Sequence, residues 1–314
     1  MIPEFPEFKK LELTDKKDIE KFTLKFPPYS DFNFVSMWSW DIKGEMRISQ
    51  LYGNLVVRFA DYITGKPFYS FLGNKNTNST VEKLFSLSKD EKLDMLLKLV
   101  PEDSVLGLDT KKYNIVEDRD HFDYIYHTET LAKLHGSKLK KKLTQTEFFI
   151  KEYPKAEIRL LHLGDKKTQS DVIKLYKKWI TNKIIEKLFF TFEHKELEVI
   201  KRLFIINEVA ELISVGIFID NKLVAFFINE LNNSNYCLGM IAKAEVALPG
   251  IYAFLRKKNA EIIFSFGKEF MNDEQDLGIE NLRNAKTQFR HHSFFKKYII
   301  SYKLAEGTFA PPTP

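Results

Sequence analysis

The chain has a single cysteine, Cys237, among its 314 residues. It therefore cannot form an internal disulfide, which is typical of proteins in a reducing compartment. Its seven histidines are scattered, and no C-x-x-C or H-E-x-x-H spacing occurs. The neighbours His291 and His292 would not face each other on a helix, so we expect a polar helix end there. These absences predict no metal cofactor and a cytoplasmic location.

Long apolar runs are also missing. No stretch approaches the roughly 18 consecutive apolar residues that span a bilayer. The opening residues, MIPEFPEF, lack the basic and apolar regions of a signal peptide. We therefore expect neither a transmembrane segment nor a secretion signal. The formal net charge of +5 permits an anionic partner without requiring one.

Phenylalanine is abundant, with 28 residues, and the length suffices for two domains with aromatic cores. Apolar spacing in the C-terminal half predicts helices near 172–180 and 197–204, strands at 212–219, 223–231 and 236–241, and a helix at 251–263. The N-terminal half repeats this order coarsely, with helices at 14–22 and 31–40, strands at 47–52, 55–59 and 68–72, and a helix at 81–87. We predict an α+β protein with lobes at 1–150 and 151–304 and a disordered tail at 305–314.

The segment 271–289, MNDEQDLGIENLRNAKTQF, has the polar density of a functional site. An acidic, amide-rich loop leads into a short helix on which Arg283 and Lys286 share one face, while apolar residues form another. The ordinary alternative is that Asp276 caps this helix and that Glu280 pairs with Arg283 at the surface.

Four motifs, in this order, resemble those of the phosphatidylglycerol lysyltransferase C-terminal domain family. They are FPPY followed by FNF and Trp38, the run DRDHFDYIY, the run LHGSK, and the set Asn272, Glu274, Asp276, Leu277, Gly278, Leu282, Arg283 and Lys286. The resemblance covers roughly residues 8–303. It implies two tandem acetyltransferase-like (GNAT) lobes, similar to the Fem aminoacyl-tRNA-dependent transferases, with mainly antiparallel mixed sheets flanked by helices.

The resemblance also implies a function, namely transfer of an acyl group, here aminoacyl from a charged tRNA, to an amine or hydroxyl acceptor. The acceptor would be a small molecule, a peptide or a lipid headgroup. Arg283 and Lys286 would hold the donor's phosphate or carbonyl oxygen. Asn272 and Asp276 would bind its ammonium or orient the acceptor, with Glu274 as a further substrate-binding residue. Two alternatives stay open: a coenzyme A-dependent N-acyltransferase, and a non-catalytic binding protein that keeps the cleft.

Two further residues are placed by the predicted strands. Glu230 ends one strand and Tyr236 begins the next. In an acetyltransferase-like lobe this region faces the cleft, so we predict Glu230 as a base toward an amine and Tyr236 as an acid, with Asp276 as the third catalytic residue. The ordinary alternative for Glu230 is a surface carboxylate. We expect Asp276, Arg283 and Lys286 to line one cleft, with Glu230 on its opposite wall.

The densest basic cluster follows Gly136. It contains Lys138, Lys140, Lys141 and Lys142. A helix beginning here favours phosphate or nucleic-acid binding, such as a tRNA acceptor end, through Lys138, Lys141 and Lys142. The alternative is a solvated helix face. No aromatic residue interleaves with these lysines, so base stacking is not predicted there.

Glycine is scarce where coenzyme A chemistry needs it. In single-lobe acetyltransferases a glycine-rich loop after the fourth strand cradles the coenzyme A pyrophosphate. The corresponding stretch here, AKAEVALPG, has one glycine. Close approach of several backbone N–H groups to a phosphate depends on glycine. We therefore predict weak or absent acetyl-CoA binding, and acyl-CoA as a poorer donor than aminoacyl-tRNA.

Overall fold

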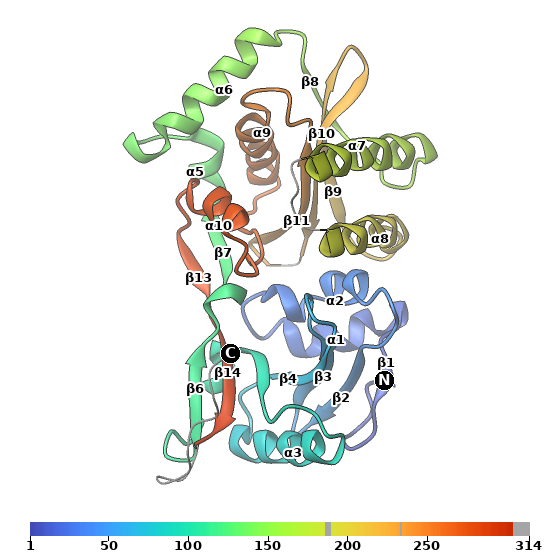
Figure 1. Cartoon of the computed structure of the whole chain (residues 1–314), viewed down its shortest axis with the longest axis vertical. Coiled ribbons are helices and arrows are strands. Elements are labelled where there is room, and N and C mark those ends of the chain that lie inside the picture. The colour runs from blue at the N-terminus through green and yellow to red at the C-terminus, as the bar shows by residue number, and fades with distance from the viewer. Residues whose placement is uncertain (186–189, 233, 304–314) are drawn as a thin grey trace. The chain divides into compact units, whose positions relative to one another are not determined.

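The structure, a computed structural model, describes residues 1–185, 190–232 and 234–303. The chain forms two compact units. Within the described residues, unit 1 comprises 1–10, 46–119 and 296–303, and unit 2 comprises 11–45 and 120–295. Each unit contains one seven-stranded sheet flanked by helices (Figure 1).

Unit 1 is built on a sheet of order β1-β2-β3-β4-β5-β14-β6, in which only β4 and β5 pair in parallel. Its elements are β1 (Lys9–Lys10), β2 (Arg47–Leu51), β3 (Asn54–Ala60), β4 (Pro67–Leu72), α3 (Thr77–Asp90), β5 (Leu97–Pro101), α4 (Glu102–Val105), β6 (Tyr113–Glu117) and β14 (Lys297–Tyr302). The β2–β3 hairpin turns through Tyr52 and Gly53, both at positive φ, as a two-residue turn matched to strand twist requires.

Unit 2 is built on a sheet of order β13-β7-β12-β11-β10-β9-β8, in which only β11 and β12 pair in parallel. Its strands are β7 (Asp123–His127), β8 (Glu157–Leu160), β9 (Leu212–Ile219), β10 (Lys222–Leu231), β11 (Tyr236–Ala244), β12 (Phe270–Asn272) and β13 (Ser293–Phe295). Its helices are α1 (Lys16–Thr23), α2 (Phe34–Trp40), α5 (Thr128–Lys133), α6 (Lys140–Glu152), α7 (Lys166–Ile185), α8 (Phe190–Ile206), α9 (Ile251–Ser265) and α10 (Glu280–Thr287).

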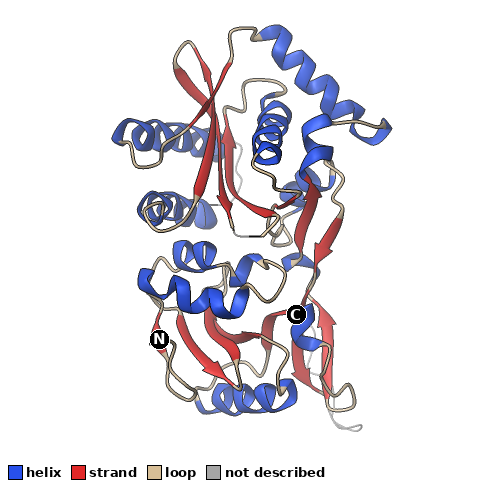
Figure 2. Cartoon of the chain, turned by 180° about the vertical axis from the view of Figure 1, so that it is seen from behind, coloured by secondary structure: helices blue, strands red, loops and turns tan. Residues whose placement is uncertain are grey.

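Helices cover both faces of the sheet in unit 2. Helix α9 lies on one face, where α5 and α6 pack against it, and α7 and α8 lie on the other (Figure 1). Figure 2 shows the same layers from behind. The core under α9 is strongly aromatic, with Tyr124, Tyr126, Phe149, Phe227 and Phe254 buried together. Helix α2 belongs to unit 2 and packs against α8.

The predicted fold class is confirmed. Both sheets are mainly antiparallel and mixed, and both follow the predicted acetyltransferase-like order of elements. Helices α7 and α8 precede β9, β10 and β11, and α9 then leads to β12, which is parallel to β11. Helices α1 and α2 precede β2, β3 and β4, and α3 then leads to β5, which is parallel to β4.

The predicted boundary at residues 150 and 151 does not separate the two units. Residues 11–45 and 120–150 belong to unit 2, and β14 belongs to unit 1. The reason is strand pairing between distant segments: β7 pairs with β12 and β13, whereas β14 inserts between β5 and β6. The predicted disordered tail, 305–314, lies outside the described residues. None of the described helices combines the length and the apolar character needed to span a bilayer.

Candidate functional site

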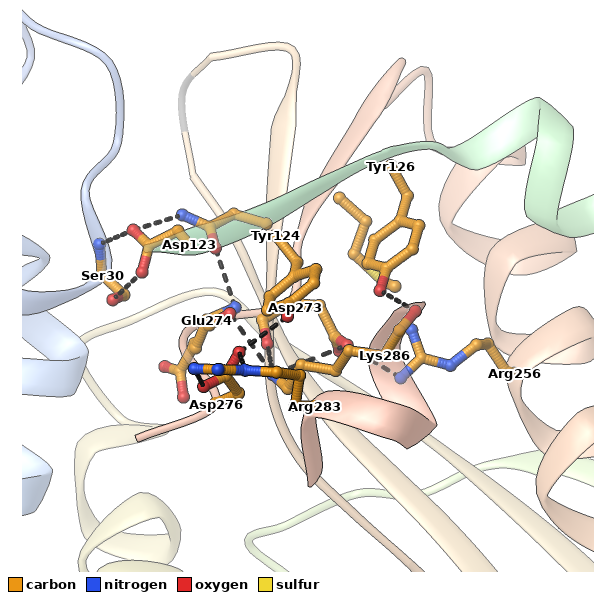
Figure 3. A network of polar contacts seen from close by, with 12 residues as sticks. Ser30, Asp123, Tyr124, Tyr126, Arg256, Asp273, Glu274, Asp276, Arg283 and Lys286 are labelled. Carbon is orange, nitrogen blue, oxygen red and sulfur yellow. Dashed lines mark hydrogen bonds and ion pairs between the residues drawn. The ribbon is translucent and has the colours of Figure 1, made fainter. Parts of the chain in front are cut away.

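The segment between β12 and α10 is the centre of a polar network that also involves β7 (Figure 3). Arg283 grips Asp276 with two parallel bonds, Nε to Oδ2 at 3.0 Å and Nη2 to Oδ1 at 2.8 Å. The Tyr124 hydroxyl donates to Asp276 Oδ2 at 2.6 Å, and the Gly278 amide donates to Oδ1 at 2.9 Å. Both oxygens of this fully buried carboxylate are thus engaged.

The electrostatics follow from these contacts. Burial would raise the pKa of Asp276, but hydrogen bonds from Arg283, Tyr124 and the Gly278 amide outweigh it and lower the pKa. Hydrogen bonds to Asp276 and Asp120 raise the pKa of Arg283. The Asp120 bond, 2.6 Å from Nη2 to Oδ1, lies on the exposed side of the guanidinium. Arg283 therefore pairs with these two aspartates rather than with Glu280, the partner that the ordinary alternative gave it.

Lys286 points inward rather than toward a ligand. Its ammonium donates to the backbone carbonyls of Asp273 and Glu274 and lies 3.7 Å from the Asp273 carboxylate. Arg256 of α9 donates from Nη2 to Asp273 Oδ2 at 2.8 Å. The Tyr126 hydroxyl closes the network by donating to the Lys286 carbonyl at 2.7 Å. These bonds fix the backbone of the loop that follows β12.

Asn272 also serves this loop. Its amide nitrogen donates to the Pro28 carbonyl at 2.8 Å and to Asp123 Oδ2 at 3.1 Å, and its Oδ1 accepts the Glu274 amide at 2.8 Å. Asp123 in turn accepts the Ser30 amide at 2.8 Å and the Ser30 hydroxyl at 2.6 Å. Asn272 is therefore occupied as a positioning residue for Glu274, which adopts a left-handed φ of +56°.

Glu230 and Glu274 accept hydrogen bonds from side chains at the start of α2. Asn33 caps this helix by accepting the Ser36 amide at 2.9 Å, and its Nδ2 donates to Glu230 Oε2 at 2.7 Å. The Ser36 hydroxyl donates to Glu274 Oε1 at 3.1 Å. Burial raises the pKa of Glu230 to about 7. Burial raises the pKa of Glu274 to about 8, with Lys286 opposing the shift and Asp123 adding to it. Both carboxyls therefore exchange protons near neutral pH.

Tyr236 takes part in a different cluster. Its ring stacks on Phe270 at 4.9 Å between centroids and contacts Phe295 at 5.4 Å. Burial raises its pKa. No hydrogen bond joins Tyr236 to Glu230 among the described residues, so the structure does not bring this predicted acid and base together.

A pocket of about 380 Å³ is lined by residues of α9 and α10. It lies on the face of the unit 2 sheet that is opposite to Glu230. Side chains alternate along β10, so Glu230 faces away from the side that presents Phe227 to this pocket. The pocket is lined by Lys142, Phe227, Ala242, Tyr252, Leu255, Arg256, Asn281, Asn284, Ala285, Gln288 and Phe289. Asp276, Arg283, Lys286 and Glu230 are not among its lining residues, so this pocket is not the cleft that the sequence analysis predicted for them.

The basic cluster is split by the structure. Lys138, Lys140 and Lys141 are exposed, whereas Lys142 on α6 lines the pocket with its ammonium 4.8 Å from the centre of the Phe289 ring. The sequence showed no aromatic residue among these lysines because Phe289 arrives from the far end of the chain. Burial lowers the pKa of Lys142, and the charges of Lys141 and Arg256 add to the shift. Sequence reasoning missed Arg256, which stands beside Lys257 and Lys258 on the helix predicted at 251–263.

The loop before α9, where single-lobe acetyltransferases have their phosphate-binding loop, is closely packed. Gly250 has φ +85°, and a Cβ there would lie 2.2 Å from the Gln145 carbonyl oxygen of α6. The helix start is thus packed against α6. The amides of Glu245, Leu248 and Ile251 are already bonded to backbone carbonyls. In the described part of the chain, no group of three or more His, Cys, Asp or Glu side chains is arranged to hold a metal ion.

Comparison with known proteins places the chain in a family. A crystal structure of a conserved protein of unknown function from Bacteroides thetaiotaomicron VPI-5482 matches with a TM-score of 0.82 and 24% identity, over 96% of this chain and 100% of that one. The structure of L-PGS from Bacillus licheniformis matches with a TM-score of 0.61 and 10% identity, over 96% of this chain and 93% of that one. A search of curated proteins found no match. Residues 28–301 match the family described as phosphatidylglycerol lysyltransferase, C-terminal, and the chain therefore belongs to that family.

Proposed function

We propose that this protein is an acyltransferase that moves an aminoacyl group from a charged tRNA to an amine or hydroxyl acceptor. Family membership and the acetyltransferase-like order of elements support acyl transfer as the class of reaction. The observation that carries the proposal is Glu274, a half-buried residue on a left-handed turn, whose carboxyl accepts from the Ser36 hydroxyl and whose amide donates to the Asn272 side chain. A general base or acid works best when its pKa lies near the working pH, as it does here.

In this proposal the acceptor nitrogen or oxygen attacks the ester carbonyl of the aminoacyl group, and the bond to the tRNA ribose oxygen breaks. Glu274 takes the proton that the acceptor loses and returns it to the ribose oxygen, which leaves as a hydroxyl. Glu230 is only 4% exposed, so direct proton transfer belongs to Glu274 rather than to Glu230. Asp276 and Arg283 neutralise each other and, with Asn272 and Lys286, hold the turn that carries Glu274.

Aminoacyl-tRNA is favoured over acyl-CoA as the donor for a structural reason. The start of α9 is covered by α6 at Gly250, and three amides around it already have partners. A pyrophosphate there would find few free N–H groups. Coenzyme A-dependent N-acyl transfer remains the second candidate, and the non-catalytic alternative predicts no turnover with either donor.

The test supplies labelled aminoacyl-tRNAs and, in parallel, acetyl-CoA, together with an extract of cellular amines, peptides and lipids, and follows label into product. We expect product from aminoacyl-tRNA. Glu274→Gln should lower kcat by about 100-fold or more and remove the rise in rate with pH near 8. Glu280→Gln, which changes an exposed carboxyl on α10, is the matched control and should retain full activity. Product from acetyl-CoA alone, or full activity in Glu274→Gln, would contradict the proposal.

A further inference from the structure

The pocket lined by α6, α9 and α10 takes no part in the proton transfer assigned to Glu274. It lies on the other face of the sheet in unit 2, and its volume is in the range of small-molecule sites. Parallel pairing of β12 with β11 covers only Tyr236 to Leu238, whereas β11 continues to Ala244. The pocket occupies the space beside this extension, where Ala242 is part of its wall. It is therefore available to a molecule that is neither donor nor acceptor.

Two cations lie close together at the wall of this pocket. The Lys142 ammonium and the central carbon of the Arg256 guanidinium are 4.8 Å and 4.7 Å from the centre of the Phe289 ring, so they are at most about 9.5 Å apart. Lys142 forms no ion pair with a carboxylate in the described part of the chain. Like charges repel more strongly where water is partly excluded. A negative group bound near both cations would relieve that repulsion.

Arg256 also has an unused donor. Its Nη2 binds Asp273 Oδ2 at 2.8 Å, whereas its buried Nη1 has no hydrogen-bond partner. A buried N–H without an acceptor is costly, so an oxyanion that accepts from it would be stabilised. Lys286, 3.7 Å from the same Asp273 carboxylate, shares that negative charge. Together with Lys142 these side chains carry a formal charge of +2, which a phosphate monoester balances at neutral pH.

The remaining lining suits a polar body attached to the phosphate. A phosphate ion alone would leave much of the volume of about 380 Å³ empty. Asn281, Asn284 and Gln288 follow one another at helical spacing along α10 and its end, so their exposed side chains share one side of the pocket. Amides both donate to and accept from hydroxyl groups or the edge of a base. Phe227 and Leu255 add apolar surface for the rest of the ligand.

We propose that this pocket binds a small phosphate monoester with a hydroxyl- or amide-bearing body, and that this ligand is an effector rather than a reactant. Arg256 would join the phosphate to Asp273, the residue before Glu274 (Figure 3). Lys286 donates to the carbonyls of both Asp273 and Glu274. A phosphate on Nη1 holds the guanidinium in place and so stiffens the turn that carries Glu274. The binding site is independent of the proposed function, whereas its effect on catalysis rests on that function.

The test is calorimetric titration with AMP, glucose 6-phosphate and inorganic phosphate. We expect one of the two esters to bind about tenfold more tightly than inorganic phosphate, and the better one identifies the body as a nucleoside or a sugar. Lys142→Gln should weaken binding of that ester about tenfold. Lys151→Gln, the matched control at the exposed far end of the same helix, should change it less than about twofold. Asn284→Ala should weaken binding of the ester but not of inorganic phosphate.

Several results would overturn the assignment. Inorganic phosphate bound as tightly as both esters would leave a simple anion site, and no binding of any of the three at millimolar concentration would refute the pocket. Equal losses in Lys142→Gln and Lys151→Gln would indicate a diffuse electrostatic surface. The ester should slow amide hydrogen exchange at residues 272–276, and unchanged exchange would refute the effector role.

Transfer activity is measured separately. Ester binding without transfer from either donor refutes the proposed function but keeps the site. Transfer without binding of any probe refutes the site but keeps the function.

Discussion

Arg283→Ala tests whether the pair of Arg283 with Asp276 stabilises the fold of the polar segment 271–289 and is thus a structural clamp. Asp276 is fully buried, and Arg283, whose side chain is 35% exposed, gives it two charge-assisted hydrogen bonds. Such bonds contribute about 1.5–3 kcal/mol each. Tyr124 and Gly278 remain as donors, and water can enter where the guanidinium was. We therefore expect a loss of about 2–3 kcal/mol in the free energy of unfolding, less than for a fully buried pair.

The assay is urea unfolding followed by tryptophan fluorescence. All three tryptophans, Trp38, Trp40 and Trp179, lie in unit 2, so the signal reports on the unit that contains Arg283. With a typical urea m-value, the midpoint should fall by about 1 M. Asp120→Ala removes only the exposed partner of Arg283 and should cost about 1 kcal/mol or less.

The pH dependence provides a second check on the clamp. The folded pKa of Asp276 is lowered, so its contribution is present above the ordinary value of 3.8 and is lost as the pH falls through the folded value. In Arg283→Ala that loss should begin at a higher pH. The reasoning is refuted if Arg283→Ala costs less than Asp120→Ala, or if it lowers transfer activity while stability stays unchanged.

Three further predictions concern unit 2. Burial raises the pKa of Glu230 from 4.5 to about 7, so the folded state keeps a proton that the unfolded chain releases, and stability falls as the pH rises across that interval. Glu230→Gln should remove this fall and be roughly 3 kcal/mol more stable than wild type at pH 8, measured by urea unfolding; equal stabilities there would contradict it. Gly250→Ala combines left-handed strain with a clash against α6 and should cost more than about 2 kcal/mol in thermal unfolding. Gly267→Ala has similar φ but open space around it and should cost only about 1 kcal/mol, so equal costs would rule out the α6 contact. Tyr124→Phe should cost about 1–2 kcal/mol by removing a donor to buried Asp276, and a neutral result would mean that water replaces the hydroxyl.

Local periodicity predicted the regular elements well. The helix expected at 251–263 is α9, and the hairpin expected at 212–231 is β9 and β10. The strands β7, β12 and β13 were not predicted, because each is three to five residues long and is stabilised by partners far away in the chain. The misplaced domain boundary has the same cause, since local patterns carry no information on such pairings.

The candidate site shows the same limit. The sequence indicated that residues 271–289 form a polar centre, and the structure gathers Asp276, Arg283 and Lys286 there. It did not indicate that these charges satisfy one another, because Tyr124 and Asp120 come from another part of the chain. Glu274, Lys142 and Arg256 acquire their settings only through α2, Phe289 and Asp273, respectively.

The order in which the ribosome delivers this chain matters because the two units are interleaved. The polypeptide passes from one unit to the other after residues 10, 45, 119 and 295. Strand β14, between β5 and β6, is the last strand described, so β5 and β6 emerge well before the strand that joins them. Until then their edges are open to wrong partners. We therefore expect nascent chains stalled before residue 297 to depend on chaperones. We also expect that neither unit folds stably when it is expressed as one contiguous fragment.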